Sequence, residues 1–329
     1  MKKLWSRVWE DKFYLVSILI LIILFQIKLP FYVNAPGGVI NINDRITYSG
    51  KKDWNGSLNM LYVTEYVASV PIYLLSYIIP DWDLESIEVN QVSDNESVED
   101  INIRNKVMLS NSINNAYIVA LDKAGVGYSI SNQKYIVVAN TLKNDFSIGD
   151  EVLGVEGKSV DSLEMIREII SKKEVGDKIL VRVKRNKKIK DIEATVFEED
   201  KKKALGVVIL KDYSIDTNSD ISLQFKSSES GASGGLMMAL SIYLSVSGED
   251  LLKGRNVAGT GTIDQDGNVG EIGGIKYKVM GAYRNHMDVI LVPSANYKEA
   301  MEVKKKKGYD IEIVEVKTFD DAINYLKNH

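Results

Sequence analysis

The feature that most constrains the fold lies at residues 230–238, "SGASGGLMM", where a serine is surrounded by glycine and alanine directly before an apolar run. Glycine and serine mark a loop, and small residues let a helix begin close to its neighbours. The following residues, "LMMALSIYLSV", carry no charged side chain. A helix that is apolar all round is buried. The sequence therefore predicts a domain built around one buried helix that starts at a small-residue loop.

The segments around this loop alternate between strand and helix patterns. Two strands are expected in residues 205–225, and a hairpin is expected to turn at Asp266-Gly267. An amphipathic helix from Ile275, a buried strand at 288–293 and a final strand and helix follow. This alternation is typical of an α/β or α+β domain.

Composition excludes several classes of site. The 329 residues are 45% hydrophobic, enough for two or three domains, and the net charge of −4 offers no basic surface for nucleic acid. The absence of cysteine excludes disulfides, thiolate metal sites and cysteine nucleophiles. A Ser-His-Asp triad would need His286, in a charged stretch, or His329, the last residue. Neither a P-loop nor an H-E-x-x-H motif occurs, so we expect no metal and no cofactor.

The N-terminus resembles a membrane anchor. Residues 13–27 are uncharged and flanked by Lys12 and Lys28, and a helix of this length spans about 22 Å. Snorkelling lysines and the aromatic "LPFYV" would extend the apolar length. The alternative is a cleaved signal peptide, but no convincing A-x-A site follows. The positive-inside rule predicts a cytoplasmic N-terminus at 1–12, an anchor at 13–33 and the remainder outside the cell.

Residues 34–118 are expected to form an extracellular segment that packs with the C-terminal domain. The stretch "LNMLYVTEYVASV" reads as a strand. The apolar "IYLLSYII" is too short for a second span and is broken by Pro80 and Asp81, so it is interpreted as a helix packed on its own domain. The acidic "SDNESVEDINIRN" is interpreted as a solvated loop that leads into a helix.

Residues 119–200 show short strands around one helix, with "GDEVLGVEGKSVDSLEMIREII" as the most characteristic part and a hairpin turning at Asn186. This order resembles a PDZ domain. Such a fold binds an extended peptide as an added strand beside a helix. The resemblance implies a peptide groove lined on its strand side by Tyr135, Ile136 and Val138 and on its helix side by Leu163, Ile166 and Ile170. The alternative is that these residues are simply core.

Residues 201–329 are similar to the proteolytic domain of Lon-type peptidases. The matching motifs are Ser233 in "SGASGG", "TGTI" at 260–263 and "IGGIKYK" at 272–278. Ala232 and Ser230 differ from the residues common in that family, although both keep the loop small. The fold class expected for the whole chain is multi-domain α+β: a single transmembrane helix, a PDZ-like domain and a C-terminal Lon-type α/β domain.

The chemistry follows from the residue types. A serine nucleophile needs a base within hydrogen-bond reach, and lysine can serve where burial lowers its pKa from about 10.4 to roughly 7 to 8. The apolar "GGIKYKVMGAY" offers Lys276 and Lys278; helical periodicity favours Lys276, whereas the family resemblance places the base at Lys278. The resemblance also implies that Thr260 hydrogen-bonds the lysine.

Ser227, Ser228 and Ser230 share the loop with Ser233. Ser233 is preferred because Gly234-Gly235 and the helix N-terminus follow it and supply free N–H groups for an oxyanion. Ala232 and Gly234 are expected to support this arrangement by keeping the loop small.

These features together predict an ATP-independent, membrane-anchored extracellular serine endopeptidase with a Ser-Lys dyad, which cleaves peptides or unfolded surface and secreted proteins while the PDZ-like module selects them. The family resemblance implies a ring-shaped homo-oligomer, and no nucleic-acid partner is expected. Two alternatives stay open: an inactive PDZ-containing surface adaptor and a structural cell-envelope protein.

Overall fold

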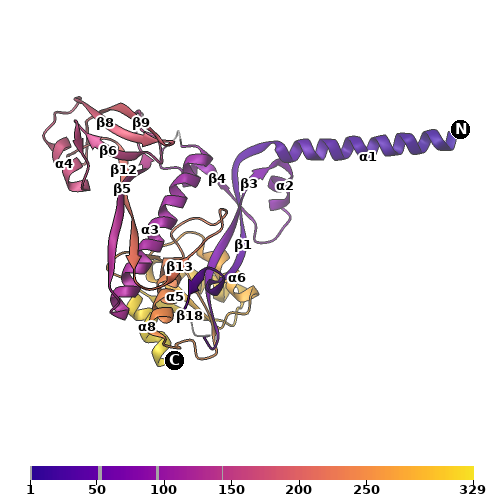
Figure 1. Ribbon diagram of the computed structural model, residues 1–329. Coiled ribbons are helices and arrows are strands. Elements are labelled where there is room, and N and C mark those ends of the chain that lie inside the picture. The colour runs from indigo at the N-terminus through magenta and orange to yellow at the C-terminus, as the bar shows by residue number, and fades with distance from the viewer. Residues whose placement is uncertain (1, 51–53, 94–95, 143) are drawn as a thin grey trace.

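The computed structural model describes residues 2–50, 54–93, 96–142 and 144–329, with side chains from residue 12 onward. Met1 of the predicted cytoplasmic N-terminus, and the side chains of residues 2–11, therefore lie outside the described part. Helix α1 (Lys2–Gln26) projects as a single rod from the rest of the molecule (Figure 1). Within the residues that the structure describes, no helix is both long enough and apolar enough to cross a membrane.

The central sheet combines strands from both ends of the chain. Its order is β18-β17-β14-β3-β1-β4, with parallel pairing from β18 to β3 and antiparallel pairing of β1 with β3 and β4. The bounds are β1 Lys28–Asn41, β3 Ser57–Ser69, β4 Asp83–Ser86, β14 Asn256–Gly259, β17 Val289–Pro293 and β18 Glu312–Val316. The N-terminal segment thus completes the sheet of the C-terminal domain.

Helices cover both faces of this sheet. Neighbouring residues on a strand point to opposite faces, so Leu58 and Met60 join one core while Leu61 joins another. On the first face pack α3 (Val98–Ala124), α5 (Gly235–Ser247) and α8 (Phe319–Asn328), and on the second pack α6 (Ile275–Arg284) and α7 (Ser294–Lys307). The result is a three-layer α/β/α domain in which α5 is the predicted buried helix.

Short elements complete this domain. Strand β2 (Ile46–Tyr48) pairs with β13 (Ile221–Leu223), and β15 (Thr262–Ile263) pairs with β16 (Val269–Gly270) in the predicted hairpin. The turn of that hairpin contains Gly267 at φ +81°. Helix α2 (Val70–Ser76) and the 3-10 helices η1 (Ile42–Asp44) and η2 (Ile87–Asn90) lie in the N-terminal segment.

A second sheet forms the PDZ-like domain, in the order β12-β5-β6-β8-β9. Its elements are β5 Tyr128–Asn140, β6 Glu151–Val155, β7 Lys158–Ser159, α4 Leu163–Ser171, β8 Lys178–Arg185, β9 Lys188–Thr195, β10 Phe197–Glu199, β11 Lys202–Ala204 and β12 Val207–Thr217. Asn186 and Lys187 have positive φ between β8 and β9, which confirms the predicted hairpin. β12 was assigned by sequence to the C-terminal domain, but it belongs to this sheet because it pairs along β5.

One interpretation of the N-terminal segment needs correction and another is confirmed in part. The helix expected in residues 72–79 forms as α2 and packs on β1 and β3 as predicted, although Leu74 and Ile78 stay 59% and 76% exposed. The acidic stretch does lead into α3 through a capping box of Ser97 and Asp100. Glu96 of that stretch is buried rather than solvated, because it forms an ion pair with Arg104.

Candidate active site

Ser233 lies at the end of the small-residue loop, directly before α5. The Ser233 carbonyl accepts hydrogen bonds from the Gly261 N–H at 2.7 Å and from the Thr260 hydroxyl at 3.0 Å. The Ser112 hydroxyl of α3 donates to the Ala232 carbonyl at 3.0 Å. These bonds fix the backbone on both sides of the serine hydroxyl.

The small residues of the loop are required by close packing. A Cβ on Gly235 would lie 2.7 Å from the Ser112 hydroxyl and 2.9 Å from the Ile263 backbone nitrogen. Gly231 adopts φ +88°, a conformation that favours glycine. The glycines therefore let α5 begin against α3 and the strand that follows β14.

Backbone donors are available beside Ser233. The N–H groups of Gly235 and Leu236 are already bonded to the carbonyls of Ala232 and Gly261. Among the described residues, the N–H groups of Ser233 and Gly234 have no hydrogen-bond partner. Unpaired N–H groups at a helix start are suited to an oxyanion. Gly234 thus has the position expected of a supporting residue, whereas the Ala232 carbonyl anchors the loop.

Lys278 of α6 is the buried lysine of the site. Its exposed fraction is 3%, and its Nζ donates a 2.9 Å hydrogen bond to the Thr260 hydroxyl, which is itself fully buried. Burial lowers the pKa of Lys278 to about 7, because an ammonium loses its hydration in this setting. At neutral pH a large fraction of the amine is therefore unprotonated and able to accept a proton.

Lys276 has different surroundings, although it lies on the same helix. Its Nζ is 2.5 Å from Asp83 Oδ2 of β4, and the Tyr277 hydroxyl donates to the same oxygen at 2.6 Å. Its side chain is 36% exposed. The helical wheel favoured Lys276, but in the structure this lysine ties α6 to β4 and stays paired with a carboxylate.

Thr260 connects the lysine to the nucleophile loop. It accepts from Lys278 and donates to the Ser233 carbonyl. Within the described residues, no hydrogen bond joins Lys278 Nζ directly to Ser233 Oγ. The structure therefore joins Lys278, Thr260 and the Ser233 carbonyl in one hydrogen-bonded chain.

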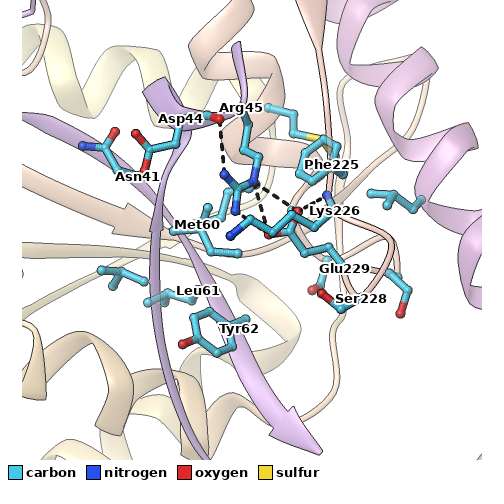
Figure 2. Close-up of a pocket in the computed structure, with 18 residues that line it drawn as sticks. Asn41, Asp44, Arg45, Met60, Leu61, Tyr62, Phe225, Lys226, Ser228 and Glu229 are labelled. Atoms are coloured by element: carbon cyan, nitrogen blue, oxygen red, sulfur yellow. Dashed lines mark hydrogen bonds and ion pairs between the residues drawn. The ribbon is translucent and has the colours of Figure 1, made fainter.

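A cavity of about 520 Å³ opens beside Ser233 (Figure 2). One wall comes from β1 and β3, with Ile40, Met60 and Tyr62, and the opposite wall comes from the loop between Phe225 and Gly234. The walls mix apolar side chains with the exposed edge of a small-residue loop. A cavity of this size and lining can hold side chains of a peptide.

An ion pair that sequence reasoning missed closes one side of this cavity. Arg45, which follows η1, places Nη2 2.5 Å from Glu229 Oε1 and Nε 3.1 Å from Glu229 Oε2. Burial alone would raise the pKa of Glu229, but the hydrogen bonds from Arg45 and the Lys226 N–H lower it below its ordinary value. The two residues are 184 positions apart, and no local pattern links them.

The cavity beside α4 lies against a different strand from the one predicted for the peptide groove. Tyr135 and Val138 are buried, and β5 has β12 on one side and β6 on the other, so it offers no free edge. The strand side of the prediction, including Ile136, was therefore wrong. Leu163, Ile166 and Ile170 of α4 do line a cavity of about 390 Å³, and the facing residues are Leu205, Val207 and Ile209. β12 is the edge strand of this sheet, and this position explains why β12 rather than β5 borders the cavity beside α4.

The remaining candidates differ in position. His286 is exposed at a positive φ, and His329 is exposed with Nδ1 3.1 Å from the Tyr325 carbonyl. Ser227, Ser228 and Ser230 are exposed in the loop, and Ser228 and Ser230 line the cavity beside Ser233. In the described part of the chain, no group of three or more histidine, aspartate or glutamate side chains could hold a metal ion.

Comparison with known proteins identifies two domains. The model of the Lon protease (S16) C-terminal proteolytic domain matches residues 213–328, and the PDZ domain model matches residues 124–196. Over 96 residues the chain is 32% identical to the Lon protease of Mesomycoplasma hyopneumoniae (strain 232), covering 29% of this chain and 11% of that protein. It is 35% identical over 98 residues to the Lon protease of Mycoplasma pneumoniae (strain ATCC 29342 / M129 / Subtype 1), covering 30% and 12%.

The chain thus spans about a tenth of the length of the curated relatives that it matches. Among solved structures, the PDZ domain of the SdrC-like protein from Listeria monocytogenes is similar at 15% identity, covering 25% of this chain and 93% of that domain, with a TM-score of 0.23. The corresponding domain from Listeria innocua has 17% identity, 23% and 92% coverage and a TM-score of 0.22. The two family models show that the chain contains a PDZ domain at residues 124–196 and a Lon protease (S16) C-terminal proteolytic domain at residues 213–328.

Proposed function

We propose that this chain is a membrane-anchored, ATP-independent serine endopeptidase in which Ser233 and Lys278 form the catalytic dyad. The observation that carries the proposal is the buried Lys278 amine, held by the same Thr260 hydroxyl that binds the Ser233 carbonyl. A lysine with its pKa lowered by burial, joined through Thr260 to the loop that presents a serine, is the arrangement that a serine nucleophile without histidine requires.

The mechanism follows from these groups. Ser233 Oγ turns toward Lys278 Nζ, gives its proton to the neutral amine and attacks the carbonyl carbon of a peptide bond. The N–H groups of Ser233 and Gly234 hold the oxyanion of the tetrahedral intermediate. The intermediate collapses when the Lys278 ammonium returns a proton to the leaving amine. Water then attacks the acyl-enzyme with Lys278 as base, and this step releases the acid product and restores the serine.

The PDZ domain is proposed to select the substrate. The edge of β12 at Val207 and Ile209 faces Ile166 and Ile170 of α4 across a cavity. An extended peptide can pair with a free strand edge while its side chains enter the apolar space beside the helix. Because the sequence contains no Walker A motif, we propose peptides and loosely folded proteins as substrates, which need no ATP-driven unfolding.

The membrane location is proposed from α1. Its apolar side chains are exposed on every side, from 72% at Phe13 to 40% at Phe25. Exposing so many apolar side chains to water is costly, and a bilayer would cover them. The excess of basic residues before this stretch supports a cytoplasmic N-terminus and an extracellular catalytic domain. Assembly into a ring remains part of the proposal on the strength of the family resemblance.

Cleavage of a diverse peptide library by the purified full chain tests the proposal. Ser233→Ala should reduce kcat/KM by at least about a thousandfold, because the nucleophile is lost. The matched control is Ser227→Ala, which removes an exposed serine of the same loop and should retain full activity.

Activity that survives Ser233→Ala would overturn the assignment of the nucleophile. A chain that cleaves nothing but retains peptides in a pull-down would instead favour the adaptor. Mass spectrometry of the products would also give the residue preference at the cleaved bond.

A further inference from the structure

The helix α2 and the turn after it carry an apolar surface that the catalytic site does not use. Leu74, Leu75, Tyr77 and Ile78 are 59%, 41%, 69% and 76% exposed, and they form what is called here the α2 surface. No charged residue occurs between Val70 and Pro80. Single exposed apolar residues are ordinary on a protein surface, but a continuous group marks a contact site.

The position of the α2 surface indicates which kind of partner would contact it. Helix α2 contacts the end of α1, and it also packs on β1 and β3 at the place where α1 leaves the folded body (Figure 1). A bilayer that held α1 along its apolar residues would reach the level of Phe25 and Ile27. Because α2 lies directly beside this junction, the same bilayer would meet the α2 surface.

Aromatic side chains are concentrated around the same junction. Phe31 lies 5.4 Å from Tyr73, and Tyr73 lies 5.5 Å from Tyr77, measured between ring centroids. Tyr66 and Trp82 form a further pair at 6.1 Å. Tyrosine and tryptophan favour the level of the lipid headgroups, where one end of the ring is apolar and the other is hydrated.

The two carboxylates that follow this surface in the sequence are paired with cations of the protein. Asp81 binds Lys307 Nζ at 2.6 Å and also pairs with Arg284, while Asp83 binds Lys276. These ion pairs leave both carboxylates compensated by cations of α6 and α7. An anionic lipid surface would therefore meet apolar and aromatic side chains at α2 rather than free negative charge.

We propose that the α2 surface lies in the headgroup region of the bilayer that holds α1. This inference rests on the proposed membrane anchor and adds a second point of contact to it. A single helix would leave the folded body free to tilt and rotate above the membrane. Contact at both α1 and α2 restricts that rotation, and so it sets the direction in which the cavity beside Ser233 faces.

Spin labels on single cysteines can measure this contact, because the native chain has no cysteine. The full chain is placed in vesicles of phosphatidylcholine and phosphatidylglycerol, and label accessibility to oxygen and to a water-soluble nickel chelate is measured. The label at Ile78→Cys reports α2, and the label at Ile20→Cys reports α1. Ile189→Cys is the matched control, because Ile189 is also an exposed isoleucine, at 65%, but lies in the PDZ domain.

We expect the oxygen-to-nickel accessibility ratio to be highest at residue 20, intermediate at residue 78 and lowest at residue 189. A ratio at residue 78 equal to that at residue 189, with residue 20 still in lipid, would overturn the α2 inference while the anchor stood. An aqueous ratio at residue 20 would overturn the anchor itself. Spin-spin broadening at residue 78 that disappears on dilution with unlabelled chain would assign the surface to a second copy and also overturn the inference. Ile78 is so exposed that the substitution should leave unfolding unchanged, which a thermal melt checks.

Discussion

Helices α1 and α5 are both long apolar segments, yet the structure places them in opposite environments. Apart from the half-buried Leu24, the large hydrophobic side chains of α1 from Phe13 to Phe25 are between 40% and 72% exposed, whereas the side chains of α5 from Leu236 to Leu244 are at most 5% exposed. α5 is surrounded by α3, α8 and the central sheet. The difference shows that the apolar character of a helix predicts burial but does not indicate which surroundings bury it.

The beginnings of the two helices differ as much as their surroundings. α5 starts at a glycine whose Cβ position is blocked by Ser112 and Ile263, so its first turn is held in place by neighbours. Two free N–H groups and the Ser233 hydroxyl lie at that point. A buried helix can therefore fix the geometry of a site at its N-terminus, which a helix without protein neighbours cannot do.

The largest expected effect is on catalysis, and it concerns the buried amine of Lys278 instead of buried apolar side chains. Lys278→Met should reduce kcat/KM at least about a thousandfold, while Lys276→Met, which removes an amine paired with Asp83, should retain activity. For the native chain, kcat/KM should rise with pH through about 7, because the neutral amine is the active form. A pH profile of kcat/KM for the three chains measures this. An unchanged rise in Lys278→Met would contradict the assignment.

The same substitution should raise stability. The folded pKa of Lys278 is about 7 and the unfolded value is near 10.4, so between these values the unfolded chain binds more protons and stability rises with pH. Below about pH 7 the full penalty of burying the ammonium is present. Lys278→Met removes it, and at pH 6 the free energy of unfolding should increase by a few kcal/mol, at about 1.4 kcal/mol per pKa unit. Equal stability of both chains at pH 6, measured by urea unfolding, would argue against a buried amine.

The same substitution, leucine to alanine, made in each of the two helices tests the comparison directly. Leu240→Ala in α5 should lower the free energy of unfolding by about 2 to 5 kcal/mol, because it leaves a cavity in a closed core. Leu19→Ala in α1, where the side chain is 57% exposed, should change it by less than about 0.5 kcal/mol. Denaturant unfolding followed by circular dichroism gives both values. Similar losses for the two variants would mean that α1 is also packed against protein.

The smallest expected effect concerns the ion pair between Arg45 and Glu229 in the loop before α5. Arg45→Ala removes the bonds to Glu229 and frees the loop that carries Ser233, so kcat should fall about tenfold with a smaller change in KM. Glu229→Ala should have a similar effect, and the double variant should be no worse than either single one, because the two residues act through one contact. Peptide cleavage by the four chains tests this. Losses that simply add would show that Arg45 and Glu229 act separately.

Local patterns predicted a large part of the fold. The small-residue loop, the uniformly apolar α5, the amphipathic α4 and the turns at Asn186 and Gly267 each have a signal within a few residues. The motifs around Ser233, Thr260 and Lys278 also lie in order along the chain, and the hydrogen bonds place all three in one site.

Predictions that depended on distant pairing were less successful. The strand side of the peptide groove was assigned to β5, although β12 is the free edge, because strand order in a sheet is not encoded in any one strand. The wheel on α6 favoured Lys276 over Lys278, since its phase is uncertain by a residue. Their tertiary neighbours distinguish them: Asp83 of β4 pairs with Lys276, whereas Lys278 is buried and bonded to Thr260.

The sequence by itself determined which residue types are available for chemistry: a serine in a small-residue loop, lysines instead of useful histidines, and no thiol. It also determined helices such as α4 and α5 and the turns at Asn186 and Gly267, because those depend on contacts within a few residues. Only the tertiary structure decided that Lys278 is the buried lysine, that Arg45 reaches Glu229 and that α2 is exposed beside α1. The physical reason is that burial, pKa shifts and ion pairs depend on neighbours contributed by distant parts of the chain.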